Sequence, residues 1–412
     1  MTETVTVIGG GMVGISCALE LQRRDYQVTL IDRRGVGEET SSGNAGVLSY
    51  SNITPIAAPE LWHRLHRLAF NQDTDFLLHY PHFAALSPWL LRFLIRCNRR
   101  TYFKDGHSMR RITIPSIDMH REWIKQAGVT HLANESGGLK LYRGRESFVR
   151  DQIERDLMDQ CEVAYRVVTA EEIAELEPDL NPIFDCGVLI EDSISIRNPE
   201  ELCKAYAKMF VDAGGEIRQS DIHSVERRSG QWMLNGDQQG AHQRLVICLG
   251  AWTPRILKQL GYANPLAIER GYHTIIEPLE GRMLNRPIFD VDASYVMSQM
   301  NMGMRVSSGT NLVYRETEPT PLQLEKVIPR AREALPMGPL LLDEPWMGRR
   351  PTVPDTLPLV GPAPNHKNLW MAFGHSHMGF SQGPISGRLI ANFISGSEQP
   401  FDPGCCSPAR YL

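Results

Sequence analysis

The hydrophobic positions near the start of the chain follow first a strand pattern and then a helix pattern. Val5, Val7 and Ile8 form a short apolar run, which is typical of a strand buried in a parallel sheet. From 13 to 21, apolar residues recur every three or four positions, as on the buried face of a helix. A second apolar run, at 28–31, ends at Asp32. The pattern predicts a strand, a helix and a second strand, the opening unit of an α/β fold.

Glycines occupy the predicted turn between the first strand and the helix in the spacing Gly-x-Gly-x-x-Gly. The first glycine permits a tight turn, the second lets a diphosphate approach the backbone, and the third lets the helix pack closely on the strand. The free N–H groups at the helix start would face the diphosphate, and the acid after the second strand would accept hydrogen bonds from a ribose. The residues predicted to bind a dinucleotide here are Gly9, Gly11, Met12, Val13, Gly14 and Asp32.

The segment 33–46, RRGVGEETSSGNAG, is too rich in glycine and serine to form a helix, but it can line an extended ligand with N–H groups and hydroxyls. A nicotinamide enzyme would usually continue with a regular βαβ unit. The two arginines at 33–34 could hold a 2′-phosphate, but Asp32 would repel it, which disfavours NADP. The predicted contacts in this segment are Arg33, Ser41, Ser42, Asn44, Ala45 and Gly46.

Later segments are predicted to return to the same sheet. A helix is predicted from Pro199, with Asn198 as its cap, and the buried run 245–249 leads to Gly250 and Trp252, which predicts another cofactor contact or simply a turn. A last strand at 369–373 is followed by a predicted turn at 374–383 and an apolar helix face beyond it. The chain thus begins and ends with a strand, a glycine-rich turn and a helix.

The composition narrows the class of protein. At 412 residues, two interleaved domains are expected, and the net charge of −5 gives no reason to expect a nucleic-acid partner. No apolar run reaches about 18 residues, and no basic leader precedes the first strand, so a cytoplasmic location is expected. The eight cysteines form no C-x-x-C pair, and His375 and His377 have no nearby third ligand, so no metal site is expected.

A basic, partly apolar stretch, SPWLLRFLIRCNRRTYFKDGHSMRR, covers 87–111. Ser87 and Pro88 predict the start of a helix there. Such a helix could lie on an anionic membrane surface as a peripheral contact, or it could be an ordinary helix with a solvated basic face. Both interpretations remain open from the sequence.

Five motifs in order along the chain resemble one family: the opening glycines, SSGNAG, ERGYH, GRRPTVPDTLPLVG and GHSHMGFSQG. The chain resembles the FAD-dependent D-amino-acid dehydrogenases, in the group that includes D-amino-acid oxidase, glycine oxidase and sarcosine oxidase. The resemblance implies an α/β fold with a discontinuous Rossmann-type FAD-binding domain and a substrate domain built on a large antiparallel sheet. The expected ranges are 1–85, 197–260 and 345–412 for the first domain, and 86–196 and 261–344 for the second.

The resemblance also implies roles for residues. Arg350 matches the clamp for a substrate carboxylate, with Arg349 as the alternative, and Tyr272 matches a substrate-facing tyrosine. His375 is expected in the active site, in a turn that packs on the flavin. Arg305 is either a second anchor or structural. The further cofactor contacts expected are Ile222, Gly348, His377, Met378 and Gly379.

The implied reaction is the oxidation of a D-amino acid, or of a cyclic secondary amino acid, to the imino acid by hydride transfer from the α-carbon to N5 of FAD. The electrons would pass to a quinone or another carrier. The GHSHMG turn is similar to that of D-hydroxyproline dehydrogenases. The alternatives are an oxygen-using glycine or sarcosine oxidase, a 2-hydroxy-acid dehydrogenase, and a non-catalytic FAD-binding subunit. The presence of both Arg350 and Tyr272 argues against the last.

Overall fold

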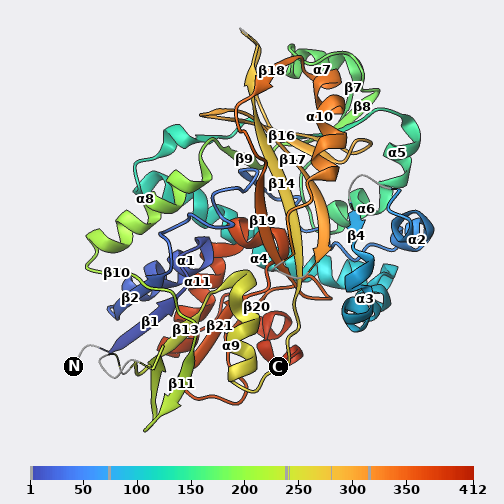
Figure 1. Ribbon diagram of the computed structural model, residues 1–412. Coiled ribbons are helices and arrows are strands. Elements are labelled where there is room, and N and C mark those ends of the chain that lie inside the picture. The colour runs from blue at the N-terminus through green and yellow to red at the C-terminus, as the bar shows by residue number, and fades with distance from the viewer. Residues whose placement is uncertain (1–2, 73–75, 237–239, 241, 280, 314–316) are drawn as a thin grey trace.

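The computed structural model describes residues 3–72, 76–236, 240, 242–279, 281–313 and 317–412, and it contains two large sheets (Figure 1). The first sheet has six strands, which come from both ends of the chain and from its middle. In spatial order they are β10 (Glu216–Gln219), β2 (Gln27–Asp32), β1 (Thr4–Ile8), β13 (Leu245–Ile247), β21 (Leu369–Phe373) and β20 (Leu359–Pro362). All neighbouring strands are parallel except the edge pair β20 and β21. This sheet confirms the predicted α/β fold.

Both faces of this sheet are buried, and successive side chains along the central strands point to opposite faces. Val5 and Val7 face a layer of helices, whereas Ile8 faces the opposite side, which is covered by a hairpin and a short helix. The helix layer contains α1 (Met12–Gln22), α4 (Arg99–Gln126), α8 (Pro199–Asp212) and α11 (Gly379–Ser395). The other side contains β11 (Val225–Arg228), β12 (Gln231–Leu234) and α9 (Thr253–Gln259).

Two glycines near the chain's end, Gly383 and Gly387, lie inside a helix and serve helix packing. The predicted turn at 374–383 is wrong in its second half, because α11 already begins at Gly379. A Cβ atom on Gly387 would lie 2.3 Å from the Ser16 carbonyl oxygen of α1, and one on Gly383 would lie 2.7 Å from Met12. Glycine is needed here so that the first and last helices can approach closely.

The second sheet has ten strands and is mostly antiparallel. Its path is β18 (Met337–Leu340), β14 (Ala267–Pro278), β17 (Gly303–Val313), β16 (Tyr295–Met300), β15 (Ile288–Asp290), β6 (Gly138–Tyr142), β8 (Cys186–Ile190) and β7 (Arg166–Thr169), with β19 (Trp346–Thr352) beside β14 and β4 (Phe76–Leu78) beside β17. Helix α10 (Leu322–Ala334) packs on one face. Three segments differ from the domain ranges expected from the sequence. Strands β4 and β19 were expected in the FAD-binding domain but lie in this second sheet, and α4 was expected in the substrate domain but packs on α11.

A small three-stranded sheet and several short helices complete the described chain. The strands are β3 (Val47–Ser49), β9 (Ser193–Ile196) and β5 (Ala133–Asn134), and the helices are α2 (Leu61–Ala69), α3 (Phe83–Arg96), α5 (Arg145–Arg150), α6 (Gln152–Gln160) and α7 (Ala170–Leu176). Within the described ranges, no helix is long and apolar enough to cross a membrane.

The predicted helix start at Ser87 and Pro88 is wrong. Helix α3 begins at Phe83 and contains Pro88. Proline removes an N–H that would bond to the carbonyl four residues earlier, but the Ser87 hydroxyl donates to that Ala84 oxygen at 2.8 Å. The basic stretch is also not one helix, because α3 ends at Arg96 and α4 begins at Arg99.

Candidate active site

A cavity of about 1340 Å³ lies between the two sheets. One end is formed by the β1–α1 turn and the end of β2, and the other by β14, β17 and β19. This volume exceeds the roughly 300–1,000 Å³ of an ordinary small-molecule pocket. The cavity therefore has room for a large elongated cofactor together with a second small molecule.

The β1–α1 turn requires glycine for two reasons. Gly9 has φ = +106°, and a Cβ atom there would lie 2.3 Å from the Cys248 carbonyl oxygen. A Cβ atom on Gly14 would lie 1.7 Å from the Gly9 oxygen. On Gly11, in contrast, the nearest atom would be the Ser41 Oγ, at 3.3 Å. Because Gly11 faces the cavity, the space over it is available to a diphosphate.

The Asp32 carboxylate is fixed by the backbone at the mouth of this turn. It accepts hydrogen bonds from the Gly10 N–H at 2.6 Å and from the Arg34 N–H at 2.9 Å. A carboxylate has about four acceptor positions, so capacity remains for a ribose. The sequence analysis did not single out Gly10. A Cβ atom there would lie 2.9 Å from the Asp32 Cβ, so the approach of Asp32 to the turn needs glycine at this position.

The Arg33 guanidinium is held by two side chains of the protein. Its Nε donates to Glu39 Oε1 at 2.8 Å, and its guanidinium lies over the Trp252 ring at 4.3 Å. Both Arg33 and Trp252 line the cavity. A guanidinium held in this way by a carboxylate and an indole is poorly placed to clamp a 2′-phosphate, which argues against NADP.

The serine-rich loop at 40–46 is held from both sides. The Ser41 Oγ accepts from the Met12 N–H at 3.1 Å, which ties the loop to the start of α1. From β17, the Arg305 guanidinium donates to the carbonyls of Ser42 and Asn44. Burial lowers the pKa of Arg305 to about 10, so the group stays charged at neutral pH. Arg305 acts on the loop and does not itself line the cavity.

Trp346 and His273 form a stacked pair beneath the loop that the sequence reasoning missed. Their ring centroids are 4.7 Å apart, with an interplanar angle of 17°. Cβ atoms on Gly43 and Gly348 would lie 2.1 Å and 2.6 Å from the Trp346 ring, so these glycines make room for the indole. Burial and the Arg305 charge lower the pKa of His273 to about 3. An available signal was the two-residue spacing of Trp346, Gly348 and Arg350, which places them on one face of a strand.

Arg350 extends from β19 into the cavity. Its Nη1 donates to the Gly309 carbonyl oxygen at 3.2 Å, and its Nη2 lies where a Cβ atom on Gly271 would be, at 2.1 Å. No carboxylate of the described residues forms an ion pair with it within 4 Å. Burial lowers its pKa, and the charge of the neighbouring Glu269 raises it. The guanidinium therefore has unused donors that face the cavity.

Tyr272 reaches the cavity wall, and its hydroxyl oxygen is used as an acceptor. It accepts from the Thr320 N–H at 2.9 Å, and its ring packs in the core under α10. Tyr295, on β16, is a second tyrosine of the wall that sequence reasoning missed. Its buried hydroxyl has no hydrogen-bond partner among the described residues. Burial and the nearby Asp290 charge raise its pKa, so it remains a neutral donor.

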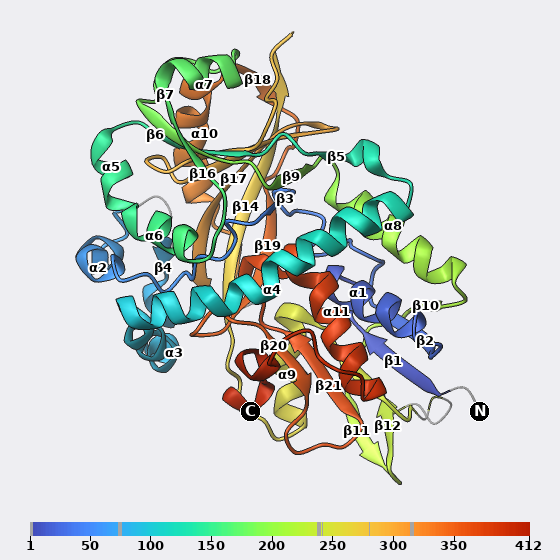
Figure 2. The same ribbon diagram turned by 180° about the vertical axis from the view of Figure 1, so that it is seen from behind.

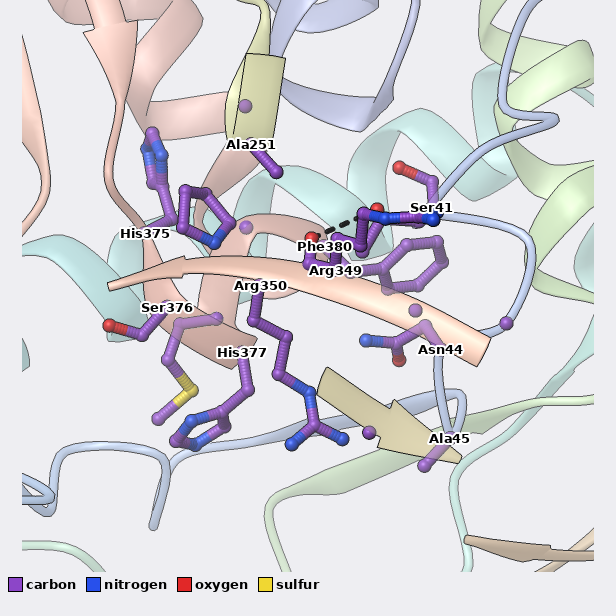
Figure 3. Close-up of a pocket in the computed structure, with 18 of the residues that line it drawn as sticks. Ser41, Asn44, Ala45, Ala251, Arg349, Arg350, His375, Ser376, His377 and Phe380 are labelled. Atoms are coloured by element: carbon purple, nitrogen blue, oxygen red, sulfur yellow. Dashed lines mark hydrogen bonds between the residues drawn. The ribbon is translucent and has the colours of Figure 1, made fainter. Parts of the chain in front are cut away.

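The GHSHMG turn brings its two histidines to different places (Figure 3). His377 lies beside Arg350 and is exposed to the cavity; desolvation by the surrounding protein, together with the Arg350 charge, lowers its pKa to about 4. His375 is turned toward α11, where its Nε2 lies 2.8 Å from the Ser386 Oγ. Because the Ser386 hydroxyl donates to the Gln382 oxygen, the Nε2–H of His375 donates to Ser386. His377 is therefore the histidine closer to the arginine clamp.

Most residues predicted for the site line this one cavity. They are Gly9, Gly11, Val13, Asp32, Arg33, Ser41, Asn44, Ala45, Ile222, Gly250, Trp252, Tyr272, Gly348, Arg350, His375, His377, Met378 and Gly379. Met12, Gly14, Ser42 and Gly46 are not part of the lining. These four shape the turn and the loop instead; a Cβ atom on Gly46, for example, would lie 2.3 Å from the Ile196 oxygen.

Comparison with known proteins decides the family. The sequence profile of the family described as DAO, "FAD dependent oxidoreductase", matches residues 4–393. The chain belongs to the DAO family. "D-amino-acid oxidase" of Bradyrhizobium diazoefficiens is 28% identical over 420 residues, covering 99% of this chain and 99% of that protein.

Solved structures share this DAO fold. The crystal structure of glycine oxidase from Geobacillus kaustophilus matches with a TM-score of 0.74 at 19% identity and covers 100% of both chains. L-proline dehydrogenase from P. horikoshii matches with a TM-score of 0.72 at 18% identity, covering 99% of this chain and 97% of that one. The expected discontinuous α/β architecture is thereby confirmed.

As a DAO-family member, the protein is an FAD-dependent oxidoreductase. The observed site fits the cofactor in three respects: Gly11, without a side chain, lines the cavity; the Asp32 carboxylate lies at the end of β2; and the cavity continues to Arg350. Gly11 would hold the diphosphate, Asp32 the ribose, and the 40–46 loop and the GHSHMG turn the flavin end.

Proposed function

We propose that this enzyme oxidises a D-amino acid, or a cyclic secondary amino acid, to the corresponding imino acid. The observation that carries the proposal is the half-buried Arg350 guanidinium at the cavity wall, which uses one donor on Gly309 and has no ion pair within 4 Å among the described carboxylates. A guanidinium of this kind suits a substrate carboxylate, because its planar fork makes two parallel hydrogen bonds. FAD, when bound, supplies the acceptor for the hydride that leaves the α-carbon.

The neighbouring groups favour an amino-acid substrate over a simple acid. His377 lines the cavity beside Arg350, and with its pKa lowered to about 4 it is neutral at physiological pH. A neutral imidazole adds no second positive charge and offers a ring nitrogen to the substrate's amino group. Tyr295 also lines the cavity, and burial with the nearby Asp290 charge keeps its hydroxyl in the neutral, donating form.

We further propose that a membrane quinone or another carrier takes up the electrons, and that the enzyme works in the cytoplasm. The eight cysteines, all free thiols, support a reducing compartment. A second candidate is an oxidase that uses oxygen, and the relative named "D-amino-acid oxidase" favours it.

One anaerobic experiment tests the substrate class. The holoenzyme is mixed with D- and L-amino acids, D- and L-hydroxyprolines and 2-hydroxy acids, and loss of the yellow flavin absorbance is followed. We expect bleaching by D-amino acids or a hydroxyproline and not by 2-hydroxy acids. Bleaching by 2-hydroxy acids alone, or by none of the panel, would overturn the proposal. Turnover with quinone compared with peroxide formation in air then separates dehydrogenase from oxidase.

A further inference from the structure

Helices α2 and α3 carry large apolar side chains that no part of the described structure covers. In α2 no residue is buried, and in α3 only Leu86 is buried. The exposed large apolar side chains here, with their exposed fractions, are Trp62 (52%), Phe70 (71%), Tyr80 (58%), Phe83 (49%), Leu91 (62%) and Ile95 (65%). We refer to these six residues as the α2–α3 surface. Both helices lie at the edge of the molecule in two opposite views (Figures 1 and 2).

Hydrogen bonds tie the segments that carry these side chains to one another. The Trp62 Nε1 donates to the Cys97 carbonyl oxygen just after α3, at 2.7 Å. The Tyr80 hydroxyl donates to the Ala69 oxygen at the end of α2, at 2.8 Å. Along α3, the exposed residues Ala84, Pro88, Leu91 and Ile95 recur every three or four positions and therefore form one stripe. A continuous apolar surface of this kind marks an interaction site, unlike single exposed apolar residues.

The charge along α3 and the first residues of α4 has one sign in the sequence. Between 83 and 104 the chain has five basic residues and no acidic one, although its net charge is −5. Arg96 pairs with Asp105 and Arg99 with Asp156, whereas Arg92 and Arg100 are exposed beside the stripe. The later part of the basic stretch contributes less, because Arg110 is turned inward onto the Cys161 oxygen.

The surface borders the opening of the active-site cavity. Arg67 and Gln72, at the end of α2, are exposed and also line the cavity. Solvent therefore reaches the cavity beside the residues that carry the apolar surface.

We propose that the α2–α3 surface docks onto an anionic lipid surface and presents the cavity opening to the membrane. Apolar side chains of amphipathic helices enter the boundary between headgroups and acyl chains, and a half-exposed tryptophan favours the same depth. Exposed arginines beside them attract anionic headgroups. Docking in this orientation would give a lipid-soluble quinone a short path to the cavity. That consequence rests on the proposed function, whereas the docking itself does not.

Co-sedimentation of the holoenzyme with vesicles tests the proposal. We expect binding to phosphatidylcholine vesicles that contain phosphatidylserine, and little binding to phosphatidylcholine alone. Binding should weaken from about 0.1 M to about 1 M salt, since the screening length falls from roughly 10 Å to roughly 3 Å. The assay needs neither substrate nor electron acceptor.

Two double variants separate the apolar and the charged contributions. Leu91→Ser/Ile95→Ser should weaken vesicle binding at least about tenfold, because two apolar side chains no longer enter the interface. Its matched control is Leu340→Ser/Leu341→Ser, which removes leucines exposed by 48% and 47% at the far strand β18 and its end.

Arg92→Gln/Arg100→Gln should lower affinity for the anionic vesicles by about fivefold per charge removed. Lys258→Gln/Lys326→Gln removes the same charge from exposed positions on α9 and α10 and should change little.

Absence of binding to the anionic vesicles overturns the proposal, and so does equal loss in the Leu91/Ile95 variant and its control. Self-association that disappears in the Leu91/Ile95 variant, without vesicle binding, would assign the surface to a second copy of the chain and would also overturn it. Vesicle binding in an enzyme that no D-amino acid or hydroxyproline bleaches would leave the docking in place and overturn only the proposed function.

Discussion

Replacing Arg350 by lysine is the most direct test of the carboxylate clamp. Lysine keeps the positive charge but cannot make two parallel hydrogen bonds to a carboxylate. The flavin end of the cavity is formed by other residues, so the flavin absorbance of Arg350→Lys should remain close to that of the wild type. The catalytic efficiency should fall.

The size of the fall follows from the hydrogen bonds that a bound carboxylate would make. Arg350 is half-buried at the cavity wall, and its Nη1 bond to Gly309 leaves the other donors to a ligand. Loss of one buried, charge-assisted hydrogen bond costs about 1.5–3 kcal/mol. We therefore expect kcat/KM to fall about 10- to 150-fold, measured with the substrate that bleaches the flavin fastest.

A second variant moves the guanidinium without changing its chemistry. A Cβ atom on Gly271 would lie 2.1 Å from the Arg350 Nη2, and Gly271 has no positive φ that would strain alanine. Gly271→Ala should therefore push the guanidinium aside and lower kcat/KM as well. Gly144→Ala is the matched control, because a Cβ atom there has no neighbour within 4 Å.

Unchanged kinetics in both Arg350→Lys and Gly271→Ala would refute the reasoning. The clamp would then have to be sought at Arg349, whose carbonyl oxygen accepts from Thr40 at the edge of the loop, or at Arg305. A fall in Gly271→Ala alone, accompanied by loss of flavin, would indicate damage to the sheet and not a displaced clamp.

Three further predictions concern the cofactor and stability. Gly11→Val should yield a folded but colourless protein, because its Cβ would lie 3.3 Å from Ser41 Oγ, a contact that a small shift of the serine side chain relieves, while its side chain fills the diphosphate position; circular dichroism and the ratio of flavin to protein absorbance check this. Arg305→Met should weaken FAD binding at least about tenfold in a fluorescence titration, because the loop carbonyls lose their donor, and an undiminished affinity would show that the loop needs no such anchor. His120 is buried, and burial lowers its pKa from 6.5 to about 4. Between these two pH values the unfolded chain binds a proton at His120 and the folded chain does not. The free energy of unfolding should therefore fall as the pH drops from 6.5 to 4. His120→Gln should reduce that slope in urea unfolding, whereas His223→Gln at the surface should not.

The cofactor end of the site was predictable because its constraints are local. A short strand, a glycine turn and a helix follow one another within a few residues, so Gly9, Gly11 and Asp32 could be placed from spacing alone. The closing strand at 369–373 was predictable for the same reason, since the turn residues on either side of the apolar run mark where the strand begins and ends.

The substrate end was less predictable because its faces depend on distant segments. Tyr272 and His273 are neighbours in the sequence, yet one packs under α10 and the other stacks on Trp346. Strand alternation says that they point to opposite faces, but not which face the cavity occupies. A register shift between Arg270 and Tyr272 adds a local irregularity that no pattern revealed. Tyr295 lies in an ordinary strand sequence and could be recognised only from the pairing of β16 with β17.

The close contact between the first and last helices has a consequence for synthesis on the ribosome. Strand β1 is translated first, but its neighbour β13 comes from the middle of the chain, and α11 packs on α1 only after residue 387 has been made. At about 5–20 residues per second, the 412 residues take roughly 20–80 s to translate. During that time the apolar face of α1 lacks its partner, and the nascent chain exposes it to chaperones and to other nascent chains. FAD capture, although its glycine turn is among the first segments to leave the ribosome, should therefore be a post-translational event, and loss of the last helix should be as damaging to cofactor binding as loss of the first.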